Sequence, residues 1–321
     1  MLSFDSKTVR FLARMGARGV LGQAVYDYVC DGNDIFAVSA DLAHASGFDR
    51  LLRDYPEKVV DVGIAEQNLI GVSAGLSRTG IPTVATSWAM FTSARVADQV
   101  RNFMGYMQSN IKLIGMDSGF VQSRFSYSHS NPPDIAIMRA IPGITIISPC
   151  DGVEIYRAMY AALNHKGPVY LRLTGSGMLP IIYKDFESDY VIGKANILRE
   201  GNEVAIIACG NIVKNAIDAA DKLQEKGIFA KVIDMHTIEP IDKDMLNSIK
   251  SYKLIVTMEE HLLHGGLGSA IADYYASEST KPKQIMLGVD NNYPMPGRMK
   301  YVEGIMGMLP EQVEETIEKN L

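Results

Sequence analysis

The chain has 321 residues, about twice the size of a common single domain, so its length favours two domains. Hydrophobic residues make up 47% and charged residues 21% of the sequence, which is typical of a globular protein with a large core. The formal charge of −6 argues against a surface that binds nucleic acid or an anionic membrane.

Apolar runs alternate with helical patterns through the first half of the chain. Runs such as "DIFAVSA" (34–40) are continuously apolar, which is typical of parallel strands buried on both faces. Helical segments between such strands indicate a sheet covered by helices. The expected strands are residues 34–40, 58–64, 82–87, 111–117, 143–149 and 167–173, and the expected helices include 96–107 and 152–165.

The alternation stops and then begins again in the second half. Residues 176–200 are rich in glycine, proline and charge, and this composition is typical of a linker. The expected elements beyond it are strands 203–210, 229–236 and 253–260 and helices 212–227 and 265–277. We therefore predict an α/β protein with a first domain at residues 1–178, a linker at 179–194 and a smaller α/β domain at 195–321.

The cysteine spacing and the N-terminal sequence favour a reducing compartment. Cys30, Cys150 and Cys209 lie far apart with no CxxC pair, which disfavours a disulfide framework or a zinc site. The N-terminal stretch lacks the apolar core of a signal peptide, and no run of about eighteen apolar residues occurs. We expect a cytoplasmic protein without a membrane partner.

Glu66 stands alone at the junction of a strand and a helix in "DVGIAEQNL" (61–69). An acid in the first turn of a helix interacts favourably with the helix dipole, which is the structural explanation. The functional one is that a carboxylate at the carboxyl end of a parallel strand faces the crevice where open α/β sheets bind ligands. Because no metal cluster or nucleophile–base pair is visible in the sequence, an enzyme of this kind would take its reactive group from a cofactor.

Other local patterns stay open. The glycines of "GGLGS" (265–269) suit a phosphate-binding helix start but suit close packing of a turn better. His129 lies in a polar loop where histidines are usually solvated, and Trp88 and Phe91 follow a strand where aromatic residues usually belong to the core.

Five segments of the chain follow one another in a recognisable order. They are "SADLA" (39–43), "DVGIAEQNLIGVSAGL" (61–76), "MRAIPGITIISPCDGVE" (138–154), "GPVYLRL" (167–173) and "EEHLLHGGLGSAIAD" (259–273). Together they resemble the C-terminal half of transketolases, above all the second subunit of bacterial split transketolases, and the related 1-deoxyxylulose-5-phosphate synthases.

The resemblance implies an enzyme dependent on thiamine diphosphate, with a pyrimidine-binding domain at residues 1–178 and a transketolase C-terminal domain at 195–321. It implies that Glu66 is catalytic and hydrogen-bonds a ring nitrogen of the cofactor's aminopyrimidine. A flat apolar side chain, Phe91, would stack on that ring.

Further residues take roles from the same resemblance. Trp88 would line the pyrimidine pocket, and Asp41 and Leu42 match residues near the middle of the cofactor. His129 keeps the place of a catalytic histidine in the loop at residues 119–130.

The resemblance also implies a partner chain. The family binds the diphosphate through a metal held by a GDG…N motif, and this sequence has no GDG. Its nearest look-alikes, residues 30–34 and 149–154, lack the strand context. We therefore expect an N-terminal transketolase-type subunit that supplies the motif and holds Mg²⁺ or Ca²⁺. The present chain would hold no metal and would form a homodimer within an α₂β₂ assembly.

The substrate-facing residues depart from the family. In the loop "GFVQSRFSYSHS" (119–130) the usual acid is missing and Arg124 is present. Met116 replaces a histidine, and Gly175 replaces an arginine that grips a sugar phosphate. The resemblance implies transfer of a two-carbon ketol unit to an aldehyde, here with a sugar that is unphosphorylated or carries its anionic group elsewhere. The predicted substrate-binding residues are Arg124, Arg95, Met116 and Arg172.

Two other functions stay open. The β subunit of a 2-oxo-acid dehydrogenase shares the fold and a catalytic glutamate, and a degenerate subunit could serve only as a scaffold or regulator. Retention of Glu66 and Phe91 argues against the scaffold. In the second domain, His261 and His264 could approach the site, although a packed or solvated histidine is the more common case.

Overall fold

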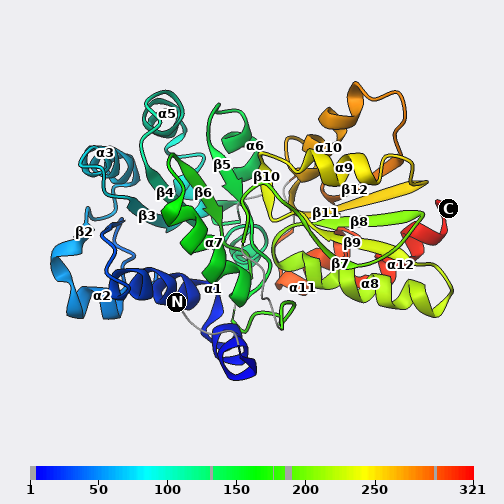
Figure 1. The fold of residues 1–321 in the computed structure, drawn as a ribbon, viewed down its shortest axis with the longest axis horizontal. Coiled ribbons are helices and arrows are strands. Elements are labelled where there is room, and N and C mark those ends of the chain that lie inside the picture. Colours follow the sequence, from blue (N-terminus) through cyan, green and yellow to red (C-terminus); the bar gives the residue numbers. More distant parts are fainter. Residues whose placement is uncertain (1–4, 131–132, 176, 185–189, 293–294) are drawn as a thin grey trace.

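The computed structural model describes residues 5–130, 133–175, 177–184, 190–292 and 295–321. In this part of the chain two β-sheets lie side by side, with the first half of the chain on the left of Figure 1 and the second half on the right. The two-sheet α/β fold confirms the predicted fold class. None of the described helices is long and apolar enough to cross a bilayer.

The first sheet is built mainly from the continuous apolar runs of the first half. Its strand order within the described residues is β10-β5-β6-β4-β3-β1-β2, and every neighbouring pair except β10–β5 is parallel. All six strands predicted for this half are present. They are β1 (Phe36–Ser39), β2 (Val59–Asp61), β3 (Thr83–Trp88), β4 (Ile111–Met116), β5 (Thr145–Ile147) and β6 (Val169–Arg172).

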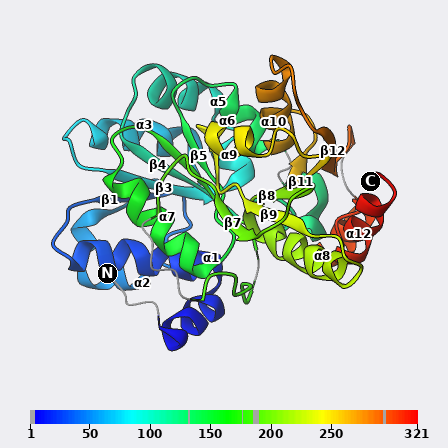
Figure 2. The same cartoon turned by 45° about the vertical axis from the view of Figure 1, so that its right-hand side comes forward.

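Side chains alternate between the two faces of this sheet, and both faces are buried. Val84 and Ile114 belong to the apolar cluster that includes the N-terminal helix, whereas their neighbours Ala85 and Leu113 belong to a second cluster on the other face. Helices α1 (Ser6–Cys30) and α7 (Gly152–Asn164) contact each other, as Figures 1 and 2 both show. Burial on both faces explains why the strands read as unbroken apolar runs.

Helix α1 is an element that the sequence patterns left unassigned. It is broken at Gly16, whose φ of 71° is in the left-handed region. A Cβ at this position would lie 2.8 Å from the Gly177 carbonyl oxygen, so glycine is required by both the turn and the close approach. The break brings Arg14 and Arg18 to the carboxyl end of the first sheet, beside Asp117 and Gly175.

The second sheet has the order β12-β11-β8-β9-β7 in the described residues. The predicted strands are β8 (Val204–Ala208), β9 (Ala230–Asp234) and β11 (Leu254–Leu262), whereas β7 (Asn196–Arg199) and β12 (Lys283–Val289) were not predicted. A further strand from this half, β10 (Thr237–Glu239), pairs antiparallel with β5 and thereby joins the first sheet. The two halves are therefore linked by backbone hydrogen bonds.

The remaining helices cover the sheets and form the loops at their edges. The predicted helix at 96–107 is present as α5 (Ala97–Gln99) followed by the π-helix η2 (Val100–Tyr106). The others are α2 (Asp49–Asp54), η1 (Pro56–Lys58), α3 (Glu66–Ser77), α4 (Ala89–Thr92), η3 (Ser123–Ser128), α6 (Asp134–Arg139), η4 (Gly210–Ile212), α8 (Val213–Glu225), α9 (Lys243–Ser248), α10 (Leu267–Ala276), α11 (Met299–Ile305) and α12 (Pro310–Glu318).

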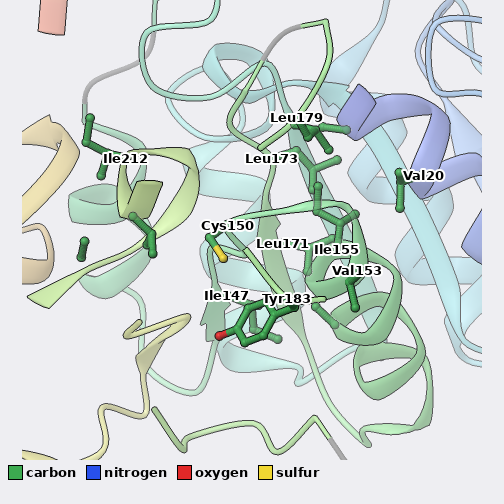
Figure 3. Packing of buried hydrophobic residues seen from close by; sticks show 14 of the residues in the cluster. Val20, Ile147, Cys150, Val153, Ile155, Leu171, Leu173, Leu179, Tyr183 and Ile212 are labelled. Carbon is green, nitrogen blue, oxygen red and sulfur yellow. The ribbon is translucent and has the colours of Figure 1, made fainter. Parts of the chain in front are cut away.

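A buried polar cluster also joins the two halves. Asp234, the last residue of β9, accepts hydrogen bonds from the Tyr183 hydroxyl (2.6 Å) and the Cys150 thiol (3.3 Å). The Cys150 backbone N–H donates to Glu154 at 2.7 Å. Figure 3 shows Cys150 and Tyr183 close to Ile147 of β5. The predicted linker at 179–194 stays a prediction, and its residues 185–189 lie outside the described residues.

Candidate functional site

Glu66 is the first residue of α3, just beyond the carboxyl end of β2. Only 5% of the residue is exposed. A cleft of about 410 Å³ lies against it, lined by residues 64–68 and Arg95. The carboxylate therefore lies at the wall of a cleft and at the positive end of a helix, a position in which both explanations drawn from the sequence apply.

The loops beside Glu66 are held by short polar side chains at the strand ends. Asp61 accepts hydrogen bonds from the backbone N–H of Asp41 (3.1 Å) and of Gly63 (2.8 Å). Ser39 accepts one from the N–H of Leu42 at 2.8 Å, and Asp41 adopts a left-handed φ of 59°. Asp61 was missed by the sequence analysis, although an acid as the last residue of an apolar strand is a signal that could have found it.

Arg95 makes two contacts with predicted site residues. Its Nη1 atom donates to Glu66 Oε2 at 3.0 Å. Its guanidinium carbon lies 4.0 Å from the centre of the Phe91 ring, which is cation–π geometry. A planar, nitrogen-rich group thus lies against the ring of Phe91 and is bound to the carboxylate of Glu66.

His129 joins this group from the loop at 119–130. Its ring centre lies 5.9 Å from that of Phe91 and 5.3 Å from that of Phe125. Nδ1 of His129 lies 3.1 Å from Ser128 Oγ. The structure therefore brings together Glu66, Phe91 and Arg95 with His129. Phe125 was missed because a single aromatic residue in a polar loop carries no signal of its own.

Trp88 lies at the end of β3 but its ring contacts a different element. The Arg18 guanidinium of α1 lies 5.3 Å from the centre of the Trp88 ring, and Arg18 Nε lies 3.6 Å from Asp117 Oδ1. Burial raises the pKa of Asp117, although Arg18 and Gln122 partly offset this effect. Arg18 and Asp117 line a cavity of about 240 Å³ together with Gly175, which is separate from the cleft at Glu66.

Met116 and Arg172, predicted to bind substrate, are completely buried within the chain. Arg172 Nε donates to Asp134 Oδ2 at 2.9 Å, and its Nη2 donates to the carbonyl of Glu260 at 2.6 Å. A buried arginine needs such partners because an unpaired charge is costly away from water. Arg172 thus links β6 with β11 inside the chain, and the substrate role of Met116 and Arg172 stays a prediction.

The histidines and glycines of the second half have structural contacts. His261 Nδ1 donates to the Leu262 carbonyl at 2.7 Å and Nε2 accepts from the Ala136 N–H at 3.2 Å, so the ring is neutral. Burial lowers the pKa of His261 to about 4. His264 is exposed. These contacts give His261 a packing role and leave His264 on the surface.

The glycine-rich start of α10 is occupied by a side chain of the chain itself. Glu259 accepts hydrogen bonds from the N–H groups of Leu267 (2.6 Å) and Gly268 (2.8 Å). A Cβ at Gly266 would lie 2.0 Å from the Glu259 carboxylate, so this glycine is needed for packing. An internal carboxylate thus satisfies the helix N-terminus, which favours packing over phosphate binding at "GGLGS".

Cys150, Glu154 and Asp234 also bring together atoms that could ligate a metal, within 4.8 Å of one another. All three are buried. Burial raises the pKa values of the thiol and of both acids, which favours their protonated forms. Because metals bind the deprotonated forms, we interpret this cluster as structural.

Comparison with known proteins covers both halves of the chain. The family model for the transketolase pyrimidine binding domain matches residues 13–177, and that for the transketolase C-terminal domain matches residues 193–313. The chain is 36% identical over 289 residues to a 6-deoxy-6-sulfo-D-fructose transketolase subunit, SqwH, from Clostridium sp., covering 89% of this chain and 88% of that protein.

Two further similarities have comparable coverage. An apulose-4-phosphate transketolase subunit from Actinobacillus succinogenes is 35% identical over 274 residues, covering 85% of this chain and 88% of that protein. A solved structure described as a split gene transketolase, inactive beta4 tetramer, superposes with a TM-score of 0.84 at 32% identity and covers 95% of this chain and 97% of its own.

Proposed function

Because this chain belongs to the transketolase family, we propose that it is one subunit of a two-chain enzyme that transfers a two-carbon ketol unit from a ketose to an aldehyde. The similar proteins from Clostridium sp. and Actinobacillus succinogenes are both named as transketolase subunits. A similar structure formed by beta chains alone is described as inactive. These names support a requirement for a partner subunit, and we propose that this partner carries the GDG…N motif and the metal.

The contacts of Arg95 carry the proposal for the cofactor site. Thiamine diphosphate contains a flat aminopyrimidine ring, which needs an aromatic face to stack on and a carboxylate as hydrogen-bond partner. The guanidinium of Arg95 stacks on Phe91 at 4.0 Å and donates to Glu66 at 3.0 Å. The two residues therefore accept a planar nitrogen-bearing group in the present structure, and we infer that they hold the aminopyrimidine in the assembled enzyme.

The residues of this chain have distinct proposed roles at the cofactor site. Thiamine diphosphate, when bound, supplies the electron sink that lets the bond next to the ketose carbonyl break. Glu66 shares a hydrogen bond with a ring nitrogen and fixes the orientation of the ring, and Phe91 excludes water from its face. Asp41 and Leu42, held by Asp61 and Ser39, form the neighbouring wall.

His129 is placed to exchange a proton with a sugar hydroxyl. Its Nδ1 atom is engaged by Ser128, and Nε2 has no hydrogen-bond partner among the described residues. Because its ring contacts Phe91, a substrate next to the stacked ring would come within reach of this nitrogen. Trp88, Met116 and Arg172 are not carried into this description because their contacts lie elsewhere.

The test is to produce the chain together with a partner subunit that carries GDG…N, and to assay each chain alone and both together. We expect ketol transfer between a ketose and an aldose only when both chains and thiamine diphosphate are present. Acyl transfer to a lipoyl domain by the same pair, without ketol transfer, would instead identify a 2-oxo-acid dehydrogenase component and refute the proposal.

A further inference from the structure

A cationic pocket lies between the loop at residues 119–130 and the start of α11. Its volume is about 490 Å³, and its charged lining residues are Arg124, Arg298 and Lys300. Arg124 comes from η3 beside the first sheet, whereas Arg298 and Lys300 come from the second half of the chain. The pocket thus gathers positive charge from two distant segments, and none of its described lining residues is acidic.

The two walls of this pocket are fixed to each other. Ser123, which is buried, donates its hydroxyl hydrogen to the Gly297 carbonyl at 2.8 Å, and the Gly297 N–H donates back to the Ser123 carbonyl at 3.3 Å. A Cβ at Gly297 would lie 2.4 Å from the Tyr301 ring, so the absence of a side chain allows this close approach. These hydrogen bonds therefore fix the segment that carries Arg124 relative to the segment that carries Arg298 and Lys300.

The charge of the pocket is not neutralised by ion pairs with described residues. Arg124 and Arg298 have no carboxylate partner within the part of the chain that the structure describes. Lys300 interacts at longer range with Glu303, whose pKa is raised by burial and only partly lowered by this lysine. Arginines grouped around a cavity without partners repel one another, so an anion bound there would relieve that repulsion.

The pocket is connected to the candidate site through aromatic contacts. Phe125 lines the pocket, and its ring centre lies 5.3 Å from that of His129. The His129 ring in turn lies 5.9 Å from that of Phe91. A ligand that reacts beside Phe91 could therefore extend past His129 and Phe125 into the cationic pocket.

Position 175 supplies no side chain for anion binding. Gly175 has a φ of 88°, and a Cβ there would lie 2.8 Å from Leu179 and 3.1 Å from the Asn211 side chain. The cavity that Gly175 lines also contains Arg14 and Arg18, but the Arg18 guanidinium already lies against Asp117 and Trp88. Among the described residues, Arg124, Arg298 and Lys300 are therefore the larger group of cations at one cavity without a close carboxylate partner.

We propose that the pocket formed by Arg124, Arg298 and Lys300 binds the terminal oxyanion of the sugar substrate, a phosphate or a sulfonate. Two guanidinium groups can form paired hydrogen bonds with such a tetrahedral group, and the ammonium group adds a point charge. The proposal rests on the proposed ketol transfer for the identity of the ligand, but the anion site itself can be tested without any reaction.

The first test measures anion binding to the chain without its partner. Thermal unfolding is followed with increasing inorganic phosphate, and separately with methanesulfonate, in the wild type and in the triple variant Arg124→Ala, Arg298→Ala, Lys300→Ala. The control is Lys281→Ala, which removes an exposed lysine of the second half outside the pocket. Because the substituted side chains are exposed, we expect the variants to fold.

We expect phosphate to raise the melting temperature of the wild type and of Lys281→Ala but not of the triple variant. Equal stabilisation of the triple variant and the wild type by phosphate, or no stabilisation of either, would overturn the anion site. If methanesulfonate stabilises the wild type as strongly as phosphate, the site favours a sulfonate, because the sulfonate achieves this with a single charge. If only phosphate stabilises the wild type, the site selects phosphate.

The second test uses the pair of subunits and separates the anion site from the proposed function. Aldose acceptors with a terminal phosphate, a terminal sulfonate or no charge are compared. For the triple variant we expect KM to rise about ten- to a hundredfold for the matching anionic acceptor, since hydrogen bonds to charged groups are lost, with little change for the uncharged one.

An equal rise for charged and uncharged acceptors would contradict the assignment of the pocket to the oxyanion. Loss of phosphate binding in the triple variant together with absence of ketol transfer for every sugar would support the anion site while refuting the proposed function. The two failures are therefore distinguishable.

Discussion

Two groups of acidic residues in this chain lie in opposite surroundings. Glu66 lies at the wall of a cleft and is paired with Arg95, whose side chain is 46% exposed. Glu154 and Asp234 lie between the two halves, fully enclosed, and their partners are a thiol, a phenol and the backbone N–H of Cys150. The carboxylates of both groups are buried, so burial alone does not distinguish a functional acid from a structural one.

The difference between the two lies in what faces the carboxylate. Arg95 reaches Glu66 from the solvent side, so this contact can be exchanged for a contact with a ligand. Glu154 and Asp234 have no such exchangeable partner among the described residues, and burial raises the pKa values of both. We therefore propose that Glu66 serves binding and chemistry, and we interpret Glu154 and Asp234 as residues that hold the two halves together.

The largest effect is expected from Glu66→Gln, which keeps the size of the side chain but removes its charge. In the reconstituted pair kcat should fall about 10²- to 10⁴-fold, because the glutamine cannot share a proton with the ring nitrogen. Glu57→Gln, at an exposed glutamate outside the cleft, is the control. Full activity of Glu66→Gln would mean that this chain is a scaffold and that Glu66 is no more functional than the enclosed acids.

The corresponding variant at the buried cluster is Asp234→Ala, which we expect to lower the stability of the fold. It leaves the Tyr183 hydroxyl and the Cys150 thiol without their acceptor, so the free energy of unfolding should fall by about 3 kcal/mol. Urea unfolding with an unchanged m-value measures this loss. Asp244→Ala, at a residue 88% exposed in its ion pair with Lys194, should change stability by less than about 0.5 kcal/mol.

A pH series tests the protonation of the same cluster. Burial raises the pKa of Asp234 from 3.8 to about 6, so between these values the folded state binds more protons than the unfolded state. The contribution of protonated Asp234 to stability is therefore fully present below pH 3.8 and is lost as the pH rises through about 6. Asp234→Asn mimics the protonated acid, so its cost relative to the wild type should shrink as the pH rises across this window.

The measurement is the difference in the free energy of unfolding between the wild type and Asp234→Asn at several pH values. This difference removes the contributions of other buried acids that both proteins share, such as Glu259, whose pKa burial raises to about 7. A cost of Asp234→Asn that grows with pH would show that Asp234 is ionised in the folded state throughout.

The smallest effect is expected at Arg95. Because its guanidinium occupies the contacts proposed for the aminopyrimidine, Arg95→Ala should bind thiamine diphosphate about tenfold more tightly in the two-chain complex. The cation–π contact and the ion pair of this half-exposed arginine together account for about 1–2 kcal/mol. Titration calorimetry measures the Kd, and Arg101→Ala, which removes an exposed arginine paired with Asp98, is the control. Unchanged or weaker cofactor binding by Arg95→Ala would contradict this interpretation.

Sequence patterns were sufficient for most of the fold. Central strands of the first sheet such as β3 and β4 were predictable because both faces are buried, which leaves continuous apolar runs such as residues 111–117. Strand β7 and strand β12 lie at the edges of the second sheet and have mixed burial, so their sequences carry no such run. Strand β10 joins the first sheet from the second half, and no local pattern encodes a pairing across the chain.

The site was predictable only in part. Glu66 and Phe91 were found through the resemblance of their segments to a family, and in the structure both contact Arg95, with His129 beside Phe91. Sequence could not show that Arg172 is enclosed by Asp134 and Glu260, because the partners of a buried charge come from distant segments. The contribution of Arg298 and Lys300 to a pocket beside Arg124 likewise depends on how the two halves pack.

The central claim is that this chain supplies only part of a composite cofactor site. Titration of thiamine diphosphate with Mg²⁺ into this chain alone, into the partner alone and into the two together tests it most directly. We predict tight binding only for the two chains together, with a loss of affinity when Phe91 is replaced by alanine. Tight binding by this chain alone, unaffected by Phe91→Ala, would contradict the account.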